Sequence, residues 1–181
     1  MKSTDTDNQL VERVLQNDSR AFTLLVLRYQ HKVLGLISRF VKDPHEAEDV
    51  AQEAFLKAYR ALPSFRGESA FYTWLYRIAT NESLTYIEQQ KKKSSYSLSD
   101  HESGLSNTLK AEKGFDANKL EWKLQLAIQS LPEKQRAVFC LRYYDEMPYE
   151  KMAHVLETSE GSLKASYHHA AKKVEEFIRN G

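Results

Sequence analysis

Apolar side chains recur at helical spacing through most of this 181-residue chain, and this periodicity constrains the fold more than any other feature. One such stripe consists of Leu120, Leu124, Ala127, Ile128 and Leu131. Residues spaced three or four apart share one face of an α-helix. Gly and Pro number only 6 and 4, and β-branched residues form only short runs. Because few residues interrupt a helix and few favour a strand, the sequence predicts an all-α fold.

The helical pattern breaks at 94–116, and this break divides the chain into two predicted domains. The break is rich in Ser, Asn, Asp and Lys and shows no sustained period, which is typical of a flexible linker. The predicted N-terminal domain covers 1–93, and the predicted C-terminal domain covers 117–181. Two small helical domains also fit the length of the chain.

Turn and cap residues predict the helix boundaries of the N-terminal domain. The polar break at 16–19 separates a short first helix from a long second helix. We expect the second helix to end near Asp43, because the residue before a proline avoids the α region. Asp43 and Pro44 are in turn a typical start for a third helix. Ser69 is the expected N-cap of a fourth helix.

An aromatic segment at 64–90 is the most distinctive part of the N-terminal domain. Its predicted core stripe is Phe71, Trp74, Leu75 and Ile78. The aromatic and cationic residues outside that stripe are Phe65, Arg66, Tyr72, Tyr76 and Arg77. Unstacked bases lie on aromatic rings and phosphates pair with Arg, so this second group favours single-stranded nucleic acid. The alternative is that most of these rings only pack in the core, and the segment by itself leaves both interpretations open.

An acidic ridge lies on one face of the predicted third helix. Glu46, Asp49 and Glu53 are spaced i, i+3, i+7, and Gln52 lies alongside them. Concentrated carboxylates favour docking of a basic partner surface. The alternative is a solvated face whose acids stabilise the helix N-terminus, which explains Glu46 but not Glu53, because the dipole acts only within the first turn.

The C-terminal domain ends in two helices joined by a tight turn at 157–159. A helix–turn–helix of this kind places its second helix in the major groove of DNA. The outward face of that helix carries hydroxyl and basic side chains: Ser162, Lys164, Ser166, His168, His169, Lys172 and Lys173. Lysine suits phosphates or guanine, and hydroxyls are permissive donors, so the pattern predicts duplex DNA binding. Any two amphipathic helices with a short turn share this layout.

Residues for catalysis or metal binding do not form a recognisable motif. The adjacent His168 and His169 point about 100° apart on a helix and do not chelate one ion together. Other ligands do not complete a set at the usual spacing. A phosphate-binding glycine loop, an HExxH pair and a nucleophile elbow are all missing from the sequence. We therefore expect no metal, no cofactor, no small-molecule substrate and no enzymatic activity.

The cellular compartment follows from equally simple features. Cys140 is the one cysteine and falls in an apolar helical run, so we expect a buried, inert thiol. A chain with a single cysteine has no internal disulfide and fits a reducing compartment. The sequence has no apolar run long enough to span a membrane, and its start lacks the layout of a signal peptide. We expect a cytoplasmic protein.

Three segments, taken in order, resemble bacterial RNA polymerase sigma factors of the sigma-70 family, extracytoplasmic-function (ECF) group. Residues 46–62, EAEDVAQEAFLKAYRAL, are similar to the segment of this group that binds core polymerase. Residues 64–81, SFRGESAFYTWLYRIATN, are similar to its promoter-melting segment. Residues 130–174, SLPEKQRAVFCLRYYDEMPYEKMAHVLETSEGSLKASYHHAAKKV, are similar to its second DNA-binding domain. Each segment is moderately specific, and the three together are highly specific.

The resemblance implies a sigma factor that binds core RNA polymerase and directs it to promoters. The residues implied to meet the basic coiled-coil clamp of polymerase are Asp49, Gln52, Glu53 and Phe55, joined by Glu46 of the acidic ridge. Those implied to hold the melted minus-ten strand, with one base flipped into a pocket, are Phe65, Arg66, Trp74, Arg77 and Asn81, joined by Tyr72. Those on the helix implied to read the minus-thirty-five element are Ser162, Lys164, Ser166, His168, His169 and Lys172. The resemblance also implies an inhibitory anti-sigma factor as a partner.

Two other functions remain open at this point. One is a stand-alone helix-turn-helix regulator that binds duplex DNA as a dimer, and the other is a helical adaptor that binds only protein. A duplex-only regulator needs neither an acidic docking ridge nor base-stacking rings. The lysines at 91–93 and the basic face of the last helix argue against a protein-only adaptor.

The last helix departs from its relatives at Ser166, His169 and Ala171, where many of them carry arginine. Two histidines, His168 and His169, lie on this helix, and histidine in general gains positive charge as the pH falls below neutral. We therefore predict that the isolated C-terminal domain binds minus-thirty-five duplex more tightly as pH falls toward about 6. Fluorescence anisotropy of a labelled duplex across this pH range measures the effect. A flat profile, or one that His168→Ala/His169→Ala leaves unchanged, would contradict it.

Overall fold

The computed structural model describes residues 5–97 and 116–180, and every regular element within them is a helix. The N-terminal elements are α1 (Asp7–Leu15), α2 (Ser19–Ile37), α3 (Pro44–Ala61), the short 3-10 turn η1 (Leu62–Ser64) and α4 (Phe71–Ser97). The C-terminal elements are α5 (Asp116–Ser130), α6 (Glu133–Tyr143), α7 (Tyr149–Leu156) and α8 (Glu160–Asn180). The predicted all-α fold class is confirmed. Within the described ranges, no helix is long and apolar enough to cross a membrane.

Helix α2 ends earlier than its sequence predicts. Its last residue is Ile37, well before Asp43. The Ser38 hydroxyl donates to the Leu34 carbonyl at 2.8 Å, and the backbone then tightens into a turn. Such local side-chain bonds compete with continuation of a helix. The turn lets Phe40 fold inward, where it is 4% exposed, so burial and not the proline determines where the helix stops.

The start of α4 also differs from the prediction. The helix begins at Phe71, two residues past Ser69, the expected cap. Gly67 makes the preceding turn at φ +71°, a conformation that glycine adopts without steric cost. At its other end α4 continues to Ser97, beyond the predicted start of the linker at 94. The rest of that predicted linker, at 98–115, lies outside the described residues.

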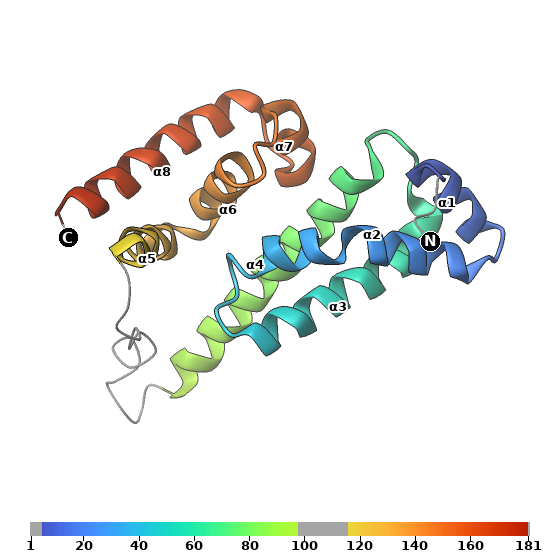
Figure 1. Ribbon diagram of the computed structural model, residues 1–181, viewed down its shortest axis with the longest axis horizontal. Helices are drawn as coiled ribbons and strands as arrows, with labels where there is room; N and C mark the ends of the chain where they lie inside the picture. The colour runs from blue at the N-terminus through green and yellow to red at the C-terminus, as the bar shows by residue number, and fades with distance from the viewer. Residues whose placement is uncertain (1–4, 98–115, 181) are drawn as a thin grey trace.

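The N-terminal domain packs α2, α3 and α4 side by side, with α1 at one end (Figure 1). Its core contains fully buried Leu25, Leu36, Leu62 and Leu75. Each such side chain contributes roughly 2 kcal/mol when it leaves water. Asp43 starts α3 as predicted, because its carboxylate accepts hydrogen bonds from the backbone of His45 and Glu46.

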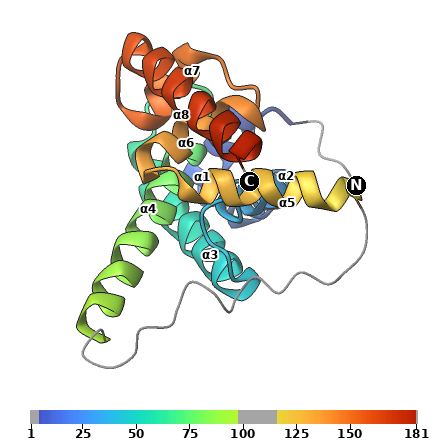
Figure 2. The same ribbon diagram turned by 90° about the vertical axis from the view of Figure 1, so that its left-hand side faces the viewer.

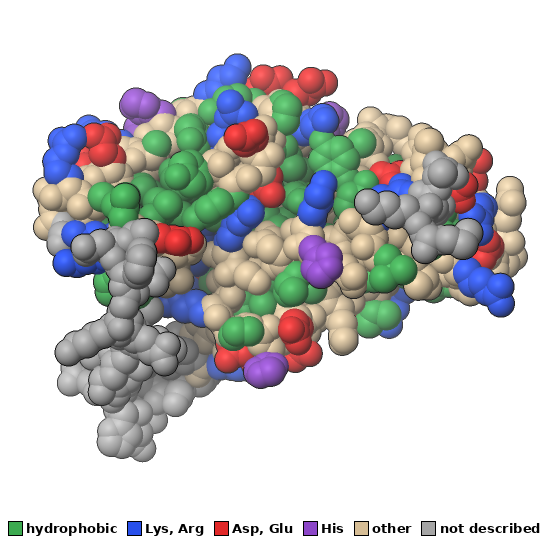
Figure 3. All heavy atoms as spheres, viewed as in Figure 1, with side chains coloured by type: hydrophobic (Ala, Val, Ile, Leu, Met, Phe, Trp, Pro, Cys, Tyr) green, Lys and Arg blue, Asp and Glu red, His purple; other side chains and the backbone are tan. Residues whose placement is uncertain are grey.

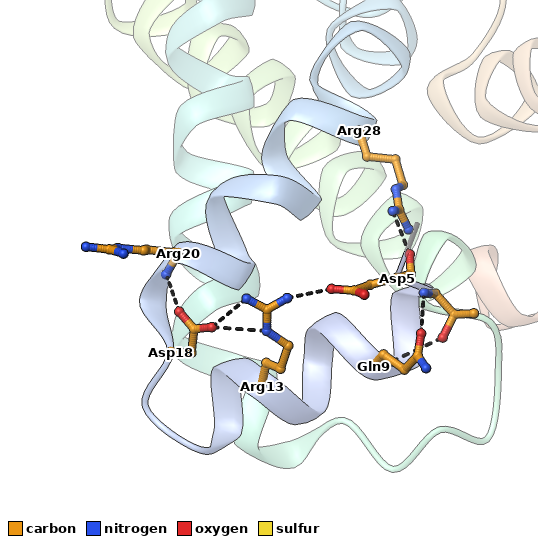
Figure 4. Close-up of polar contacts among 7 residues, drawn as sticks. Asp5, Gln9, Arg13, Asp18, Arg20 and Arg28 are labelled. Atoms are coloured by element: carbon orange, nitrogen blue, oxygen red, sulfur yellow. Dashed lines mark hydrogen bonds and ion pairs between the residues drawn. The ribbon is translucent and has the colours of Figure 1, made fainter. Parts of the chain in front are cut away.

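A polar network fixes α1 against the start of α2 (Figure 4). The Arg13 guanidinium donates to Asp5 at 2.5 Å and to Asp18 at 2.7 Å. Asp18 also accepts from the backbone nitrogen of Arg20 at 3.1 Å and so caps α2. The hydrogen bond from Arg13 holds the pKa of the Asp18 carboxyl below its ordinary value. Further along α2, the Arg28 guanidinium donates to the backbone carbonyl of Asp5 at 2.8 Å.

The C-terminal domain contains the predicted helix–turn–helix, α7 and α8. Glu157 ends α7 in the left-handed conformation at φ +50°, and the Ser159 hydroxyl accepts from the backbone nitrogen of Ser162 at 3.3 Å. Phe177 is 39% exposed. It lies near the end of α8, where that helix reaches the edge of the domain (Figure 1). Apolar side chains gather on the face over α5, α6 and α8 (Figure 3).

The two groups of helices are in contact. Helix α7 packs against the first half of α4, while the far end of α4 projects away from the rest of the molecule (Figure 2). Helix α4 therefore belongs to the core of the N-terminal domain on one side and meets the C-terminal domain on another.

Candidate nucleic-acid interface

A pocket of about 220 Å³ opens beside the first turns of α4. Its lining consists of Ser64, Phe65, Arg66, Glu68, Ser69, Thr73, Trp74, Arg77 and His154. The η1 turn and the loop after it supply one wall, and α4 supplies another. The lining combines two rings, two guanidinium groups and several hydroxyls, which are the groups that hold a base and its phosphate.

Aromatic contacts fix the wall of the pocket. The ring centroids of Phe65 and Trp74 are 5.1 Å apart, and those of Phe71 and Trp74 are 5.8 Å apart. Phe71 is buried at 1% exposure, whereas Phe65 and Trp74 are only half-buried. One part of the Trp74 ring therefore packs on the core and another lines the pocket, while its contact with a base stays a prediction.

Four of the six predicted minus-ten residues come together in this pocket: Phe65, Arg66, Trp74 and Arg77. Asn81 lies outside it, exposed one helical turn beyond Arg77. Tyr72 also lies outside it and instead has the Lys151 ammonium 5.0 Å from its ring centroid.

The burial of Tyr76 differs from what the sequence predicted. The sequence placed it with the residues outside the core stripe, but it is 4% exposed. Its neighbours in a second pocket, of about 310 Å³, include Tyr72, Asp145 and Met147. Burial raises the pKa of Tyr76 to about 12. Because Asp145 and Met147 belong to the C-terminal domain, contact between the domains explains why an outward-facing ring is covered.

Sequence analysis did not predict five of the lining residues: Ser64, Glu68, Ser69 and Thr73, which are close in sequence to the predicted ones, and His154, which is distant. His154 comes from α7 and reaches the pocket only because that helix packs against α4. On the rim, Glu157 Oε1 lies 3.2 Å from Arg77 Nη1. No local signal in the sequence marks either residue, since both positions depend on contact between distant segments.

A second surface lies on α3. An open apolar groove of about 760 Å³ runs between α2 and α3, and its lining is Ser19, Phe22, Val26, Gln30, Leu34, Glu48, Ala51, Gln52, Phe55, Leu56 and Tyr59. Gln52 and Phe55 were predicted to bind polymerase and line this groove. Leu56 and Tyr59 leave 48% and 44% of their surface in contact with solvent.

The acidic ridge lies next to this groove and does not line it. Glu46 and Asp49 are exposed on α3, and Glu53 is half-buried. Successive residues turn by about 100° around a helix, so the centre of the ridge lies roughly a third of a turn from the side that carries Gln52 and Phe55. The structure thus places an apolar groove and an acidic ridge side by side on one helix.

The outward face of α8 is exposed as predicted. Ser162, Lys164, His168, His169 and Lys172 are exposed, and Ser166 is half-buried. The two lysines form loose intrahelical pairs, Lys164–Glu160 at 3.5 Å and Lys172–Glu176 at 4.0 Å, and the Lys164 ammonium also lies 5.6 Å from the ring centroid of Tyr149. Exposed pairs of this kind contribute little, so both lysines are available to phosphates.

Metal and thiol chemistry find little support in the described part of the chain. Groups of three or more His, Cys, Asp or Glu side chains that could hold a metal ion do not occur there. Cys140 is fully buried, and burial raises the pKa of its thiol to about 12. A thiol with that pKa stays protonated and unreactive at neutral pH.

Comparison with known families identifies two regions of the chain. The family model for Sigma-70 region 2 matches residues 25–93, which include most of α2, all of α3, most of α4 and every lining residue of the pocket except His154. The model for Sigma-70 region 4 matches residues 121–174, which include α7 and most of α8.

Relatives match along the whole chain. The RNA polymerase sigma-H factor of Pseudomonas aeruginosa is 42% identical over 189 residues, covering 99% of this chain and 97% of the relative. The ECF RNA polymerase sigma-E factor of Escherichia coli K12 is 41% identical over 182 residues, covering 96% and 95%.

Solved structures share the fold. CnrH, in complex with the cytosolic domain of CnrY, aligns with a TM-score of 0.71 at 22% identity and covers 97% of this chain and 99% of its own. The sigma factor RpoE of Bartonella quintana, in complex with the anti-sigma factor NepR, aligns with a TM-score of 0.69 at 19% identity and covers 87% and 96%.

All residues of the pocket beside α4 except His154 fall in one matched region, and α7 with most of α8 falls in the other. Identity above 40% extends over nearly the full length of both relatives. The chain therefore belongs to the sigma-70 family of RNA polymerase sigma factors, in the extracytoplasmic-function group.

Proposed function

We propose that this sigma factor uses separate surfaces for binding core RNA polymerase and for recognising promoter DNA. The observation that carries the proposal is the pocket beside α4, which joins base-stacking rings to two guanidinium groups. A protein that binds only duplex DNA has no use for such a pocket, because paired bases remain stacked inside the helix. The protein acts in the cytoplasm, where core polymerase and the promoter are found.

The pocket is the proposed site for the melted minus-ten strand. One unstacked base enters it and lies against Trp74 and Phe65, whose rings already pack on the core. Arg66 and Arg77 on the exposed rim neutralise the flanking phosphates. Asn81, one turn further along α4, extends the contact toward the next nucleotide.

We predict that Trp74→Ala weakens binding of a single-stranded minus-ten oligonucleotide about tenfold, because a stacked base contributes roughly 1–3 kcal/mol. Trp74→Phe should keep most of the affinity. Arg77→Ala should reduce the salt dependence of binding by about one phosphate contact, whereas Arg20→Ala, an equal loss of charge on α2, should not. Fluorescence anisotropy at several salt concentrations measures both effects, with circular dichroism to verify folding. Equal affinity of Trp74→Ala and wild type would contradict the site.

The groove between α2 and α3 and the acidic ridge beside it are the proposed docking surface for core polymerase. Phe55 and Leu56 supply exposed or half-exposed apolar surface, and Asp49 and Glu53 supply negative charge. Apolar contact with a charged rim is the usual composition of a protein interface. A basic coiled-coil clamp matches both properties, because its charges steer the approach and its apolar stripe fills the groove.

We predict that Asp49→Lys/Glu53→Lys lowers the affinity for core polymerase about tenfold or more, since reversed charges repel a basic partner. The matched control is Glu12→Lys/Glu150→Lys, which makes the same change of charge on α1 and α7. A pull-down with bacterial core polymerase compares the three proteins. Equal binding of core polymerase by all three proteins would show that the interface lies elsewhere than on the ridge. Failure of wild type to bind would favour a stand-alone regulator.

The exposed face of α8 is the proposed reader of the minus-thirty-five element. Lys164 and Lys172 are placed for phosphates or guanine, and Ser162 and Ser166 for base edges or backbone. The family's arginine contacts are not transferred to this chain, because Lys and His do not reproduce the two-pronged geometry of a guanidinium.

An anti-sigma factor is the further proposed partner. Support comes from the Bartonella quintana relative, whose solved structure contains one. We predict that co-expression with the product of the neighbouring reading frame yields a stable complex, measured by co-purification. Absence of a complex would count against this partner and would leave the DNA and polymerase surfaces unaffected.

A further inference from the structure

Ion pairs between the two domains all have the same polarity. Among the described residues, three such pairs are present: Arg39–Asp145, Arg77–Glu157 and Lys91–Glu133. In each pair the cation belongs to the N-terminal domain and the carboxylate to the C-terminal domain. A net charge of only +1 for the whole chain conceals this segregation. The C-terminal domain thus presents carboxylates to cations on and beside α4.

The Arg39–Asp145 pair is the most enclosed of the three. Arg39 Nη1 lies 2.5 Å from Asp145 Oδ2, and the two side chains are 21% and 17% exposed. The same guanidinium lies 4.3 Å from the ring centroid of Tyr144. Burial raises the pKa of the Asp145 carboxyl, and Arg39 opposes that effect. Loss of Asp145 would leave a largely enclosed guanidinium without its carboxylate, which is costly.

The Arg77–Glu157 pair lies at the minus-ten pocket itself. Glu157 is the first residue of the helix–turn–helix turn, and its carboxylate meets one of the two guanidinium groups on the pocket rim. One turn earlier on α7, His154 forms part of the pocket lining. A carboxylate on Arg77 takes the place that a phosphate of bound DNA would take.

We propose that the C-terminal domain is an internal competitor of the minus-ten strand. In the closed arrangement its carboxylates neutralise the cations along α4, and α7 narrows the pocket, so the strand binds only after the domains separate. This inference rests on the proposed minus-ten site. The outward face of α8 stays exposed in the closed arrangement, so duplex binding there does not require opening.

The size of this competition is the factor by which the closed arrangement weakens strand binding. When only the open fraction of a protein binds, the apparent dissociation constant is the intrinsic constant divided by that fraction. Each exposed ion pair shifts an equilibrium about twofold to fivefold. The effects of two independent pairs multiply, so removing two of them should tighten strand binding about fourfold to twenty-five-fold.

The test uses the full chain and the variant Asp145→Asn/Glu157→Gln. Its matched control, Glu146→Gln/Glu150→Gln, removes two exposed carboxylates from the same segment, neither of which pairs across the domains in the described structure. The probe is a fluorescein-labelled single strand of mixed sequence, about 12 nucleotides long. Anisotropy measures affinity, and small-angle X-ray scattering measures the radius of gyration.

We expect the interface variant to bind about fourfold to twenty-five-fold more tightly than wild type and to have a larger radius of gyration. The control should match wild type in both measurements. An equal gain by the control would show a bulk charge effect and overturn the proposal. Equal affinity and equal size of wild type and interface variant would overturn it as well. If none of the proteins binds the strand, the minus-ten proposal fails and the competitor proposal fails with it.

A charge swap distinguishes loss of the Arg39–Asp145 ion pair from other effects of substituting these residues. Asp145→Arg places two guanidinium groups together and should open the molecule, whereas Arg39→Asp/Asp145→Arg recreates the pair in reverse. The swapped protein should return to the radius of gyration and strand affinity of wild type. A swapped protein that stays as open as Asp145→Arg would show that this pair does not hold the domains together.

Discussion

The packing of α4 on both domains is the constraint on which the rest of the structure depends. Its buried side, with Phe71 and Leu75, completes the core of the N-terminal domain. A second side meets α7, and between the two lie Trp74 and the pocket. These sides of α4 therefore make different contacts. A substitution on one of them affects folding, the shape of the pocket or the contact between the domains, according to the side on which it lies.

Acidic and basic side chains are concentrated on different surfaces of this protein. The acidic ridge on α3 and the cations on and beside α4 lie in the same domain but face different partners. The carboxylates of the C-terminal domain meet those cations when the domains are in contact, whereas its exposed lysines line the outer face of α8. In the proposed function, segregation of this kind lets one small protein attract polymerase and DNA at separate places, because fields act over about 10 Å at moderate salt.

Many local features could be predicted because they depend on neighbouring residues. Asp43 and Pro44 start α3, the break at 16–19 separates α1 from α2, and the turn at 157–159 joins α7 to α8. The predicted groups of residues also proved informative: four of six minus-ten candidates share a pocket. The end of α2 was predicted less well, since burial of Phe40 stops that helix before the proline could.

The sequence by itself determined the helical fold class, most helix starts and the family, because apolar period, cap residues and motif order are all local or linear properties. Only the tertiary structure decided which faces meet. It buried Tyr76, brought His154 to the pocket and paired Arg77 with Glu157. Periodicity shows that a face is apolar or aromatic but not what covers it. Contacts between residues so far apart in the chain depend on how the two domains pack, and neither segment alone records that arrangement.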